Sequence, residues 1–145
     1  MQAVEVEVDT DTGEVKVLRV WSAHDVGRAI NPLMVDGQVH GGVVQGLGLT
    51  LTEEMVWGDN GNLVNPTLMD YKIPGILDVP DFIESIIIET AEPSGPYGAK
   101  GVGENSLCGI PAAVANAIAN ATGARLRSLP FTSERVLMAL EADAN

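Results

Sequence analysis

Residues 34–54 read MVDGQVHGGVVQGLGLTLTEE and combine helical spacing with an unusual number of glycines. The apolar residues that recur every four positions are Val35, Val39, Val43 and Leu47, with Leu51 beyond them. The glycines are Gly37, Gly41, Gly42, Gly46 and Gly48. Each glycine inside a helix costs about 1 kcal/mol relative to alanine. The segment therefore predicts a helix, entered at Asn31-Pro32, in which some neighbouring group needs the space that the glycines leave.

On the N-terminal side of this segment, the pattern changes to the alternation of β-strands. Val4, Val6 and Val8 alternate with acids, and a second run covers residues 14–21 after turn-rich residues 9–13. We expect a hairpin with one buried face and a solvated acidic face. On the C-terminal side, a short hairpin is expected between residues 55–57 and 62–64, and a third strand over residues 82–89.

The last third of the chain predicts a loop followed by two helices. Residues 93–105 are rich in glycine and lack periodicity. Pro111 and Gly123 bracket a helix over residues 112–122, and Thr132 caps a final helix through Leu140. The predicted fold is α+β, with two layers, a mostly antiparallel sheet, a Gly-rich helix and two C-terminal helices.

Composition excludes several classes of protein. The 145 residues suit one domain, and the formal net charge of −12 argues against a nucleic-acid partner. A single cysteine excludes a disulfide framework, which fits a reducing, cytoplasmic setting. No apolar run is long enough for a membrane span, so no membrane partner is expected. Aromatic residues make up only 4 %, and the 16 glycines imply close approaches between backbone segments.

Two glutamines on the predicted helix are candidate binding residues. Gln38 and Gln45 are seven positions apart, and so lie within about 20° of each other around a helix axis. Their amides could serve a ligand pressed against the glycine-lined face. Alternatively, the glycines could admit a neighbouring helix or strand, to whose backbone the amides would bond.

The second candidate is the glycine loop, residues 95–104, GPYGAKGVGE. Repeated glycines let backbone N–H groups converge on an anion or cofactor. Glu104 ends the loop, and burial there would raise its pKa toward that of a general base. The loop matches neither the phosphate-loop pattern nor GxGxxG. The alternative is a surface loop with Lys100 and Glu104 in water.

Other polar residues are weaker candidates. His24 and His40 are sixteen residues apart, without a carboxylate at metal-ligand spacing. Cys108 lies in apolar sequence and is expected to be a small buried residue rather than a nucleophile. Asp25 and Arg28 flank Gly27, which suggests a turn or a local ion pair.

Taken in order, these stretches resemble the C-terminal part of the molybdenum-cofactor-binding subunit of the xanthine dehydrogenase and aldehyde oxidase family. No single motif carries the resemblance, but the joint spacing does, and it covers nearly the whole chain. The matching stretches are residues 15–20 (VKVLRV), 24–32 (HDVGRAINP), 37–38 (GQ), 45–48 (QGLG), 70–74 (DYKIP), 98–104 (GAKGVGE), 111–113 (PAA), 129–130 (LP) and 134–136 (ERV).

The resemblance implies a piece of a molybdenum hydroxylase, an oxidoreductase that acts on an aldehyde or N-heterocycle. Its cofactor would be molybdenum–molybdopterin, a pterin dithiolene, alone or extended as a dinucleotide. Glu104 matches the family's catalytic glutamate, the base for water-dependent hydroxylation. Gln38 matches a cofactor-binding glutamine, and Gln45 would lie behind it. Lys100, Gly101, Val102 and Gly103 match backbone that passes beside the metal, and no metal ligand falls on this chain.

The resemblance also implies missing parts. Residues 1–145 would be the C-terminal portion of a molybdopterin-binding domain, with the N-terminal half of the site absent, and the isolated chain would be inactive. Its partners would be that N-terminal half and the iron–sulfur and flavin subunits, which carry [2Fe-2S] clusters and FAD. The Met1 start suggests a fragment or split subunit.

Two other hypotheses stay open. One is a non-catalytic assembly domain or truncated remnant with the same fold, whose apolar faces could form a homo-oligomer. The other is an unrelated small acidic α+β binding module.

Overall fold

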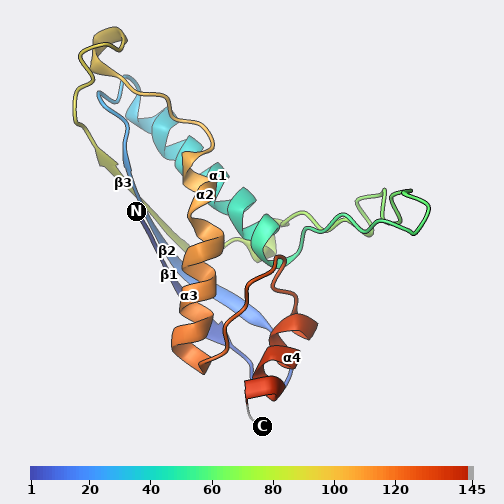
Figure 1. Ribbon diagram of the computed structural model, residues 1–145. Helices are drawn as coiled ribbons and strands as arrows, with labels where there is room; N and C mark the ends of the chain where they lie inside the picture. Colours follow the sequence, from blue (N-terminus) through green and yellow to red (C-terminus); the bar gives the residue numbers. More distant parts are fainter. Residues whose placement is uncertain (144–145) are drawn as a thin grey trace.

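The computed structural model describes residues 1–143 and shows a three-stranded sheet with helices packed against it (Figure 1). The strands are β1 (Gln2–Val8), β2 (Val15–Asp25) and β3 (Phe82–Ile88). The α-helices are α1 (Pro32–Leu51), α2 (Asn105–Cys108), α3 (Ile110–Thr122) and α4 (Ser133–Asp143). Two 3-10 turns are η1 (Ile76–Asp78) and η2 (Pro96–Gly98). The predicted α+β class is confirmed.

The sheet has the order β1-β2-β3 and is mixed. β1 and β2 form the expected antiparallel hairpin, whereas β3 runs parallel to β2, with Val20 opposite Ile83. The prediction of a mostly antiparallel sheet was therefore wrong. The reason is that the chain returns to the sheet through α1 and a long connection, and such a crossover brings the next strand in parallel.

One face of the sheet carries the core. Val17 and Val20 of β2 are buried against apolar residues of the helices, and Val4, Val6 and Val8 of β1 pack at its margin. α3 lies over β1, and α1 over β2 and β3, so the helices form the second layer. The helical residues in this core are Val39, Val43, Leu47, Ile110, Val114, Ile118 and Val136. Small and β-branched side chains fill it, as the low aromatic content requires.

The helices begin and end where their capping residues predict. The Asn31 side chain accepts a hydrogen bond from the Met34 amide, 3.2 Å away, and Pro32 occupies the first turn of α1. Gly123 ends α3 in the left-handed conformation, with φ of 88°. Thr132 caps α4 by accepting from the Arg135 amide.

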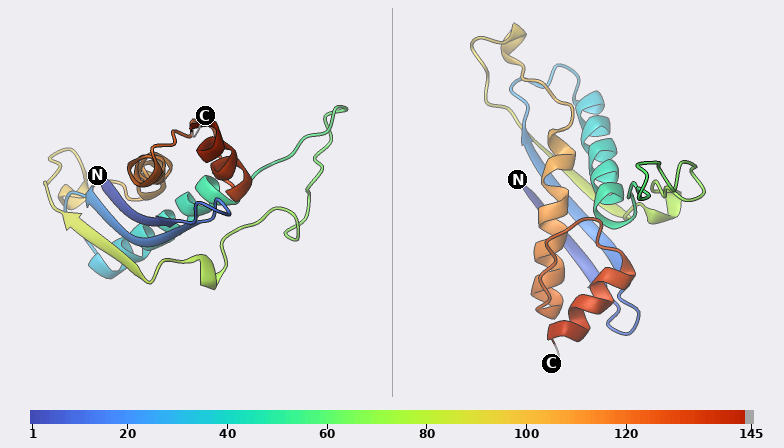
Figure 2. Two further views of the ribbon diagram at one scale, coloured as in Figure 1. Left: turned by 90° about the horizontal axis from the view of Figure 1, so that it is seen from below. Right: turned by 45° about the vertical axis from the view of Figure 1, so that its right-hand side comes forward.

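A long arm, residues 52–81, extends from the C-terminal end of α1 away from the body (Figures 1 and 2). Its expected hairpin is reduced to one bridge between Trp57 and Leu63. The base of the arm is fixed by hydrogen bonds from Thr52 to the Lys72 carbonyl and from Tyr71 to Glu53, at 2.7 and 2.6 Å. Among residues 1–143, no helix is long and apolar enough to cross a bilayer.

Candidate functional site

The glycine loop lies beyond the N-terminal end of α1, where it is attached to the end of β2 (Figure 1). The Arg28 amide donates to the Gly98 carbonyl at 2.8 Å, and the Lys100 amide donates to Val26 at 2.9 Å. Gly27 has a φ of +61°, and a β-carbon there would lie 2.9 Å from the Lys100 nitrogen. Only glycine permits this approach, so the Gly27 position holds the loop against the sheet.

An ion pair fixes the same junction. The Lys100 ammonium lies 2.7 Å from the Asp25 carboxylate, which also accepts hydrogen bonds from the Gly27 and Thr90 amides. The hydrogen bond from Lys100, followed by these amides, holds the pKa of Asp25 far below its ordinary value. Asp25 therefore pairs with Lys100 rather than with Arg28, and the Lys100 side chain anchors the loop.

Three of the candidate binding residues meet in one open groove of about 240 Å³. Gln38 of α1 lines it together with Lys100 and Val102 of the loop. The Gln38 amide is exposed and makes no side-chain hydrogen bond among residues 1–143. Gln45 is also exposed but does not line the groove. The structure thus separates two glutamines that helical spacing alone places together.

The α1 glycines divide into two groups. β-Carbons at Gly42, Gly46 and Gly48 would collide with Ser106, with Ile110 and with Pro74 and Glu53, respectively. These glycines therefore serve packing within the chain, the alternative reading of the helix. Gly37 and Gly41, which flank Gln38 on the helix, have no neighbouring atom within 4 Å of the β-carbon position.

Two glycines of the loop, like Gly37 and Gly41 of the helix, border open space. Gly101 and Gly103 have nothing within 4 Å of a β-carbon position. The amides of residues 101–103 make no backbone hydrogen bond within the described part of the chain. The loop therefore carries unpartnered N–H groups on either side of Val102, which lines the groove with Gln38. Unpartnered N–H groups of this kind can bind a polar or anionic ligand.

Glu104 immediately precedes α2 and is exposed. Its carbonyl accepts from the Leu107 amide at 3.2 Å, whereas its carboxylate has no hydrogen-bond partner in residues 1–143. The burial expected around this carboxylate is therefore not provided by the described residues. The α2 turn lies beside Gln38, because the Ser106 hydroxyl donates to the Gln38 carbonyl at 3.3 Å.

A network of hydrogen bonds connects α2 to β1 and β2. His24 Nε2 lies 2.7 Å from Ser22 Oγ, and His24 Nδ1 lies 3.0 Å from the Asn105 side-chain nitrogen. Gln2 donates to Ser22 at 2.9 Å and also to the Ser106 carbonyl. Sequence reasoning missed this network. A signal was available in the sequence of β2. Ser22 and His24 follow the buried Val20 at two-residue steps, so their side chains lie on the same face of the sheet as Val20.

The remaining candidate residues, His40 and Cys108, do not line the groove. His40 is half-exposed on α1, and its Nε2 lies 3.6 Å from the Asp36 carboxylate. Cys108 is exposed, contrary to expectation, because the short α2 turns Ser106 inward and Cys108 outward. In the described range, no group of three or more His, Cys, Asp or Glu side chains could hold a metal ion.

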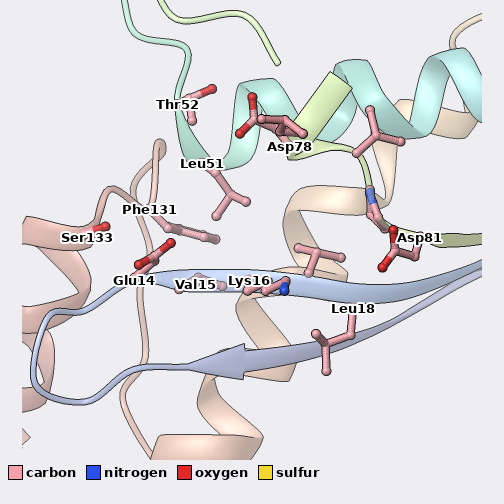
Figure 3. Close-up of a pocket in the computed structure, with 14 residues that line it drawn as sticks. Glu14, Val15, Lys16, Leu18, Leu51, Thr52, Asp78, Asp81, Phe131 and Ser133 are labelled. Atoms are coloured by element: carbon pink, nitrogen blue, oxygen red, sulfur yellow. The ribbon is translucent and has the colours of Figure 1, made fainter. Parts of the chain in front are cut away.

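A second pocket lies elsewhere, between the start of β2 and the returning end of the arm (Figure 3). It measures about 540 Å³ and is lined by acids such as Glu14, Asp78 and Asp81 together with apolar side chains. None of the candidate binding residues lines it. The open groove at Gln38 is therefore the better site candidate, because it is lined by three of the predicted binding residues.

Comparison with known proteins identifies the family of this chain. A profile described as molybdopterin cofactor-binding domain matches residues 1–80, more than half of the chain. The chain therefore belongs to this family, as part of the molybdenum-binding subunits of the xanthine dehydrogenase and aldehyde oxidoreductase group. The matched range contains Gln38, and the glycine loop lies beyond it.

Individual relatives extend the similarity along nearly the whole chain. The xanthine dehydrogenase molybdenum-binding subunit of Escherichia coli O157:H7 is 40 % identical over 134 residues, 92 % of this chain and 18 % of the relative. The nicotine 6-hydroxylase large subunit of Paenarthrobacter nicotinovorans is 44 % identical over 140 residues, 94 % of this chain and 17 % of the relative. The crystal structure of quinoline 2-oxidoreductase from Pseudomonas putida 86 matches with a TM-score of 0.87 and 40 % identity, over 94 % of this chain and 18 % of the other. This chain thus spans less than a fifth of each relative.

The groove fits the group that this family binds. A pterin is flat and carries hydrogen-bond donors and acceptors around its rings, so it needs an open surface with unpartnered polar groups. Gln38 lines the groove with an unpartnered amide, and no atom lies within 4 Å of a β-carbon position at Gly37 or Gly41.

Proposed function

We propose that this chain forms one wall of the cofactor site of a molybdenum hydroxylase. The observation that carries the proposal is the open groove in which Gln38 meets Lys100 and Val102, with unpartnered donors on both the helix and the loop. The proposed cofactor is molybdenum–molybdopterin, alone or as a dinucleotide. The proposed substrate class is an aldehyde or N-heterocycle, as in relatives that include an aldehyde oxidoreductase and a nicotine 6-hydroxylase.

Each of these residues has a separate task. When bound, the molybdenum–pterin group supplies the two-electron oxidation that inserts a water-derived oxygen into a C–H bond. The Gln38 amide hydrogen-bonds the cofactor from the helix. The amides of residues 101–103 donate from the opposite wall, and the Lys100 side chain keeps that wall in place through Asp25.

Glu104 serves as the base. Its carboxylate is free to accept a proton, because no side chain or amide in residues 1–143 occupies it. Bound cofactor and the remainder of the subunit would exclude water from this exposed carboxylate. A carboxylate positioned in this way can take a proton from the reacting group as a general base.

The exposed apolar surface supports a partner that completes the site. The arm exposes the large apolar side chains of Met55, Val56, Trp57, Val64, Leu68, Met69, Ile73, Ile76 and Leu77. A surface of this kind marks an interaction site. The proposed partner is the N-terminal half of the molybdenum-binding subunit, with FAD and [2Fe-2S] clusters on further subunits or domains.

The same surface favours a second candidate function, a non-catalytic assembly module. Such a module would form the same complex through the arm without holding a cofactor. The two functions differ in the metal content of the assembled protein.

The proposal is tested by Glu104→Gln in the complete molybdenum-binding subunit with its partners. Loss of a general base is expected to lower turnover by at least about 100-fold. Molybdenum content should stay near that of the wild type, because Gln retains the size of the side chain. Glu7→Gln is the matched control, since Glu7 is an exposed glutamate of β1 far along the sheet from the groove. Full turnover of Glu104→Gln would contradict the role of Glu104.

A further inference from the structure

The position of Glu104 depends on contacts that its own side chain does not make. It precedes a helix of only four residues, too short to be stable by itself. The carboxylate has no partner among residues 1–143, so the neighbouring residues must set its direction. Asn105 is the next residue, and its side chain is bound to the buried imidazole of His24 at 3.0 Å.

The surroundings of His24 determine which ring nitrogen carries the proton. The amide nitrogen of Asn105 can only donate, so Nδ1 of His24 accepts and the proton of the neutral ring lies on Nε2. Nε2 then donates to Ser22 Oγ, 2.7 Å away. Ser22 is fully buried, and His24 is 9 % exposed. Burial lowers the pKa of His24, which keeps the ring uncharged near neutral pH.

We propose that His24 is a positioning residue for Glu104, acting as a fixed hydrogen-bond acceptor that holds Asn105 and with it the first turn of α2. This inference rests on the proposed function of Glu104 as the base. The network is anchored on both sides, because Gln2 of β1 binds Ser22 and the Ser106 carbonyl, and Ser106 binds Gln38. His24 thereby connects the rigid sheet to the residue next to the carboxylate.

Two substitutions of His24 separate the role of Nδ1 from that of Nε2. In His24→Asn, an amide oxygen reaches the position of Nδ1 and can still accept from Asn105. In His24→Gln, the longer side chain reaches the position of Nε2 and loses the acceptor beside Asn105. In the complete molybdenum enzyme, His24→Gln should lower kcat by about 10- to 100-fold, the effect of a misplaced reacting group. KM and molybdenum content should change little, and His24→Asn should restore most of kcat.

A second variant and a second measurement make the test independent of folding in the core. Asn105→Ala removes the same hydrogen bond from the exposed side and should lower kcat by a similar factor. Combining Asn105→Ala with His24→Gln should add little further loss, because the two residues act through one contact. Hydrogen exchange of the subunit prepared without cofactor should be faster over residues 104–108 in both single variants. His40→Gln, on a half-exposed histidine, is the control and should change neither kcat nor exchange.

The outcomes separate the two proposals. Full turnover of Glu104→Gln would remove both the proposed function and the inference that rests on it. Loss of turnover in Glu104→Gln with unchanged kcat in His24→Gln or Asn105→Ala would remove only the role of His24. Equal losses in His24→Asn and His24→Gln, or unchanged exchange over residues 104–108, would also overturn it.

Discussion

At the scale of single residues, Gln38 and Gln45 are a natural matched pair. Both are exposed on α1, seven positions apart, but only Gln38 lines the groove. If the groove holds the cofactor, Gln38→Ala in the complete subunit should lower the molybdenum content of the purified protein. Gln45→Ala should leave it unchanged. Equal metal content in the two variants would contradict the assignment of Gln38.

The Asp25–Lys100 ion pair gives a prediction about pH. The folded-state pKa of Asp25 lies far below its ordinary value of 3.8, so its stabilising effect is complete above 3.8. The effect declines progressively as pH falls from 3.8 and is lost only below the folded-state pKa. Asp25→Asn should therefore loosen residues 95–103 at neutral pH, seen as faster hydrogen exchange. Wild type and variant should converge in acid. A difference that does not shrink as pH falls below 3.8 would show that another group holds the loop.

Much of the site could be predicted at this scale from the sequence. The resemblance singled out Gln38, Lys100 and Val102, and the structure brings them to one groove. The roles of all the predicted site residues remain predictions: Gln38, Lys100, Gly101, Val102, Gly103 and Glu104. The contacts of His24, Asn105 and Asp25 could not be predicted, since each joins residues far apart in the chain and depends on the path of the glycine loop.

At the scale of elements, two neighbouring glycines of α1, Gly41 and Gly42, can be compared to test whether the glycines serve packing. A methyl group on Gly42 would collide with the buried Ser106, whereas the neighbouring Gly41 faces open space. Gly42→Ala should lower the free energy of unfolding by about 1–3 kcal/mol through overpacking. Gly41→Ala should raise it by about 0.5–1 kcal/mol through helix propensity. Urea denaturation of the chain measures both, and a stabilised Gly42→Ala would contradict the packing of α2 on α1.

The Gly41→Ala variant can also separate an effect on stability from an effect on cofactor binding. In the complete subunit, the same Gly41→Ala variant should lose molybdenum if the open space beside Gln38 is occupied by the cofactor. A variant that is more stable yet poorer in metal would show that this glycine serves the ligand. Unchanged metal content would show that the cofactor does not reach this face of α1.

Element boundaries were predictable where a local signal exists. Asn31-Pro32, Pro111 and Gly123 place the ends of α1 and α3 within a few residues. The direction of β3 was not predictable from local pattern, because pairing depends on how a long connection returns to the sheet. β2 continues to Asp25 although the apolar alternation stops at Trp21, since Ser22 and His24 are buried polar residues.

At the scale of the whole molecule, the surface is that of a part rather than of a closed unit. Besides the arm, the face of the sheet opposite the helices exposes Phe82, Ile86 and Ile88, and Trp21 lies with its ring centroid 5.7 Å from that of Phe82.

Replacing Ile76 and Leu77 on the arm by Ser should weaken assembly with the rest of the subunit. Both are almost fully exposed, so the fold of this chain should be preserved. Co-purification measures the assembly, and circular dichroism checks the fold.

This chain spans less than a fifth of the length of the relatives that it matches. We propose that these residues hold one side of a molybdenum–pterin group. Metal analysis tests this directly, after co-production of this chain with the remaining part of a molybdenum-binding subunit. We expect stoichiometric molybdenum in the purified complex, and a stable complex without molybdenum would contradict the proposal.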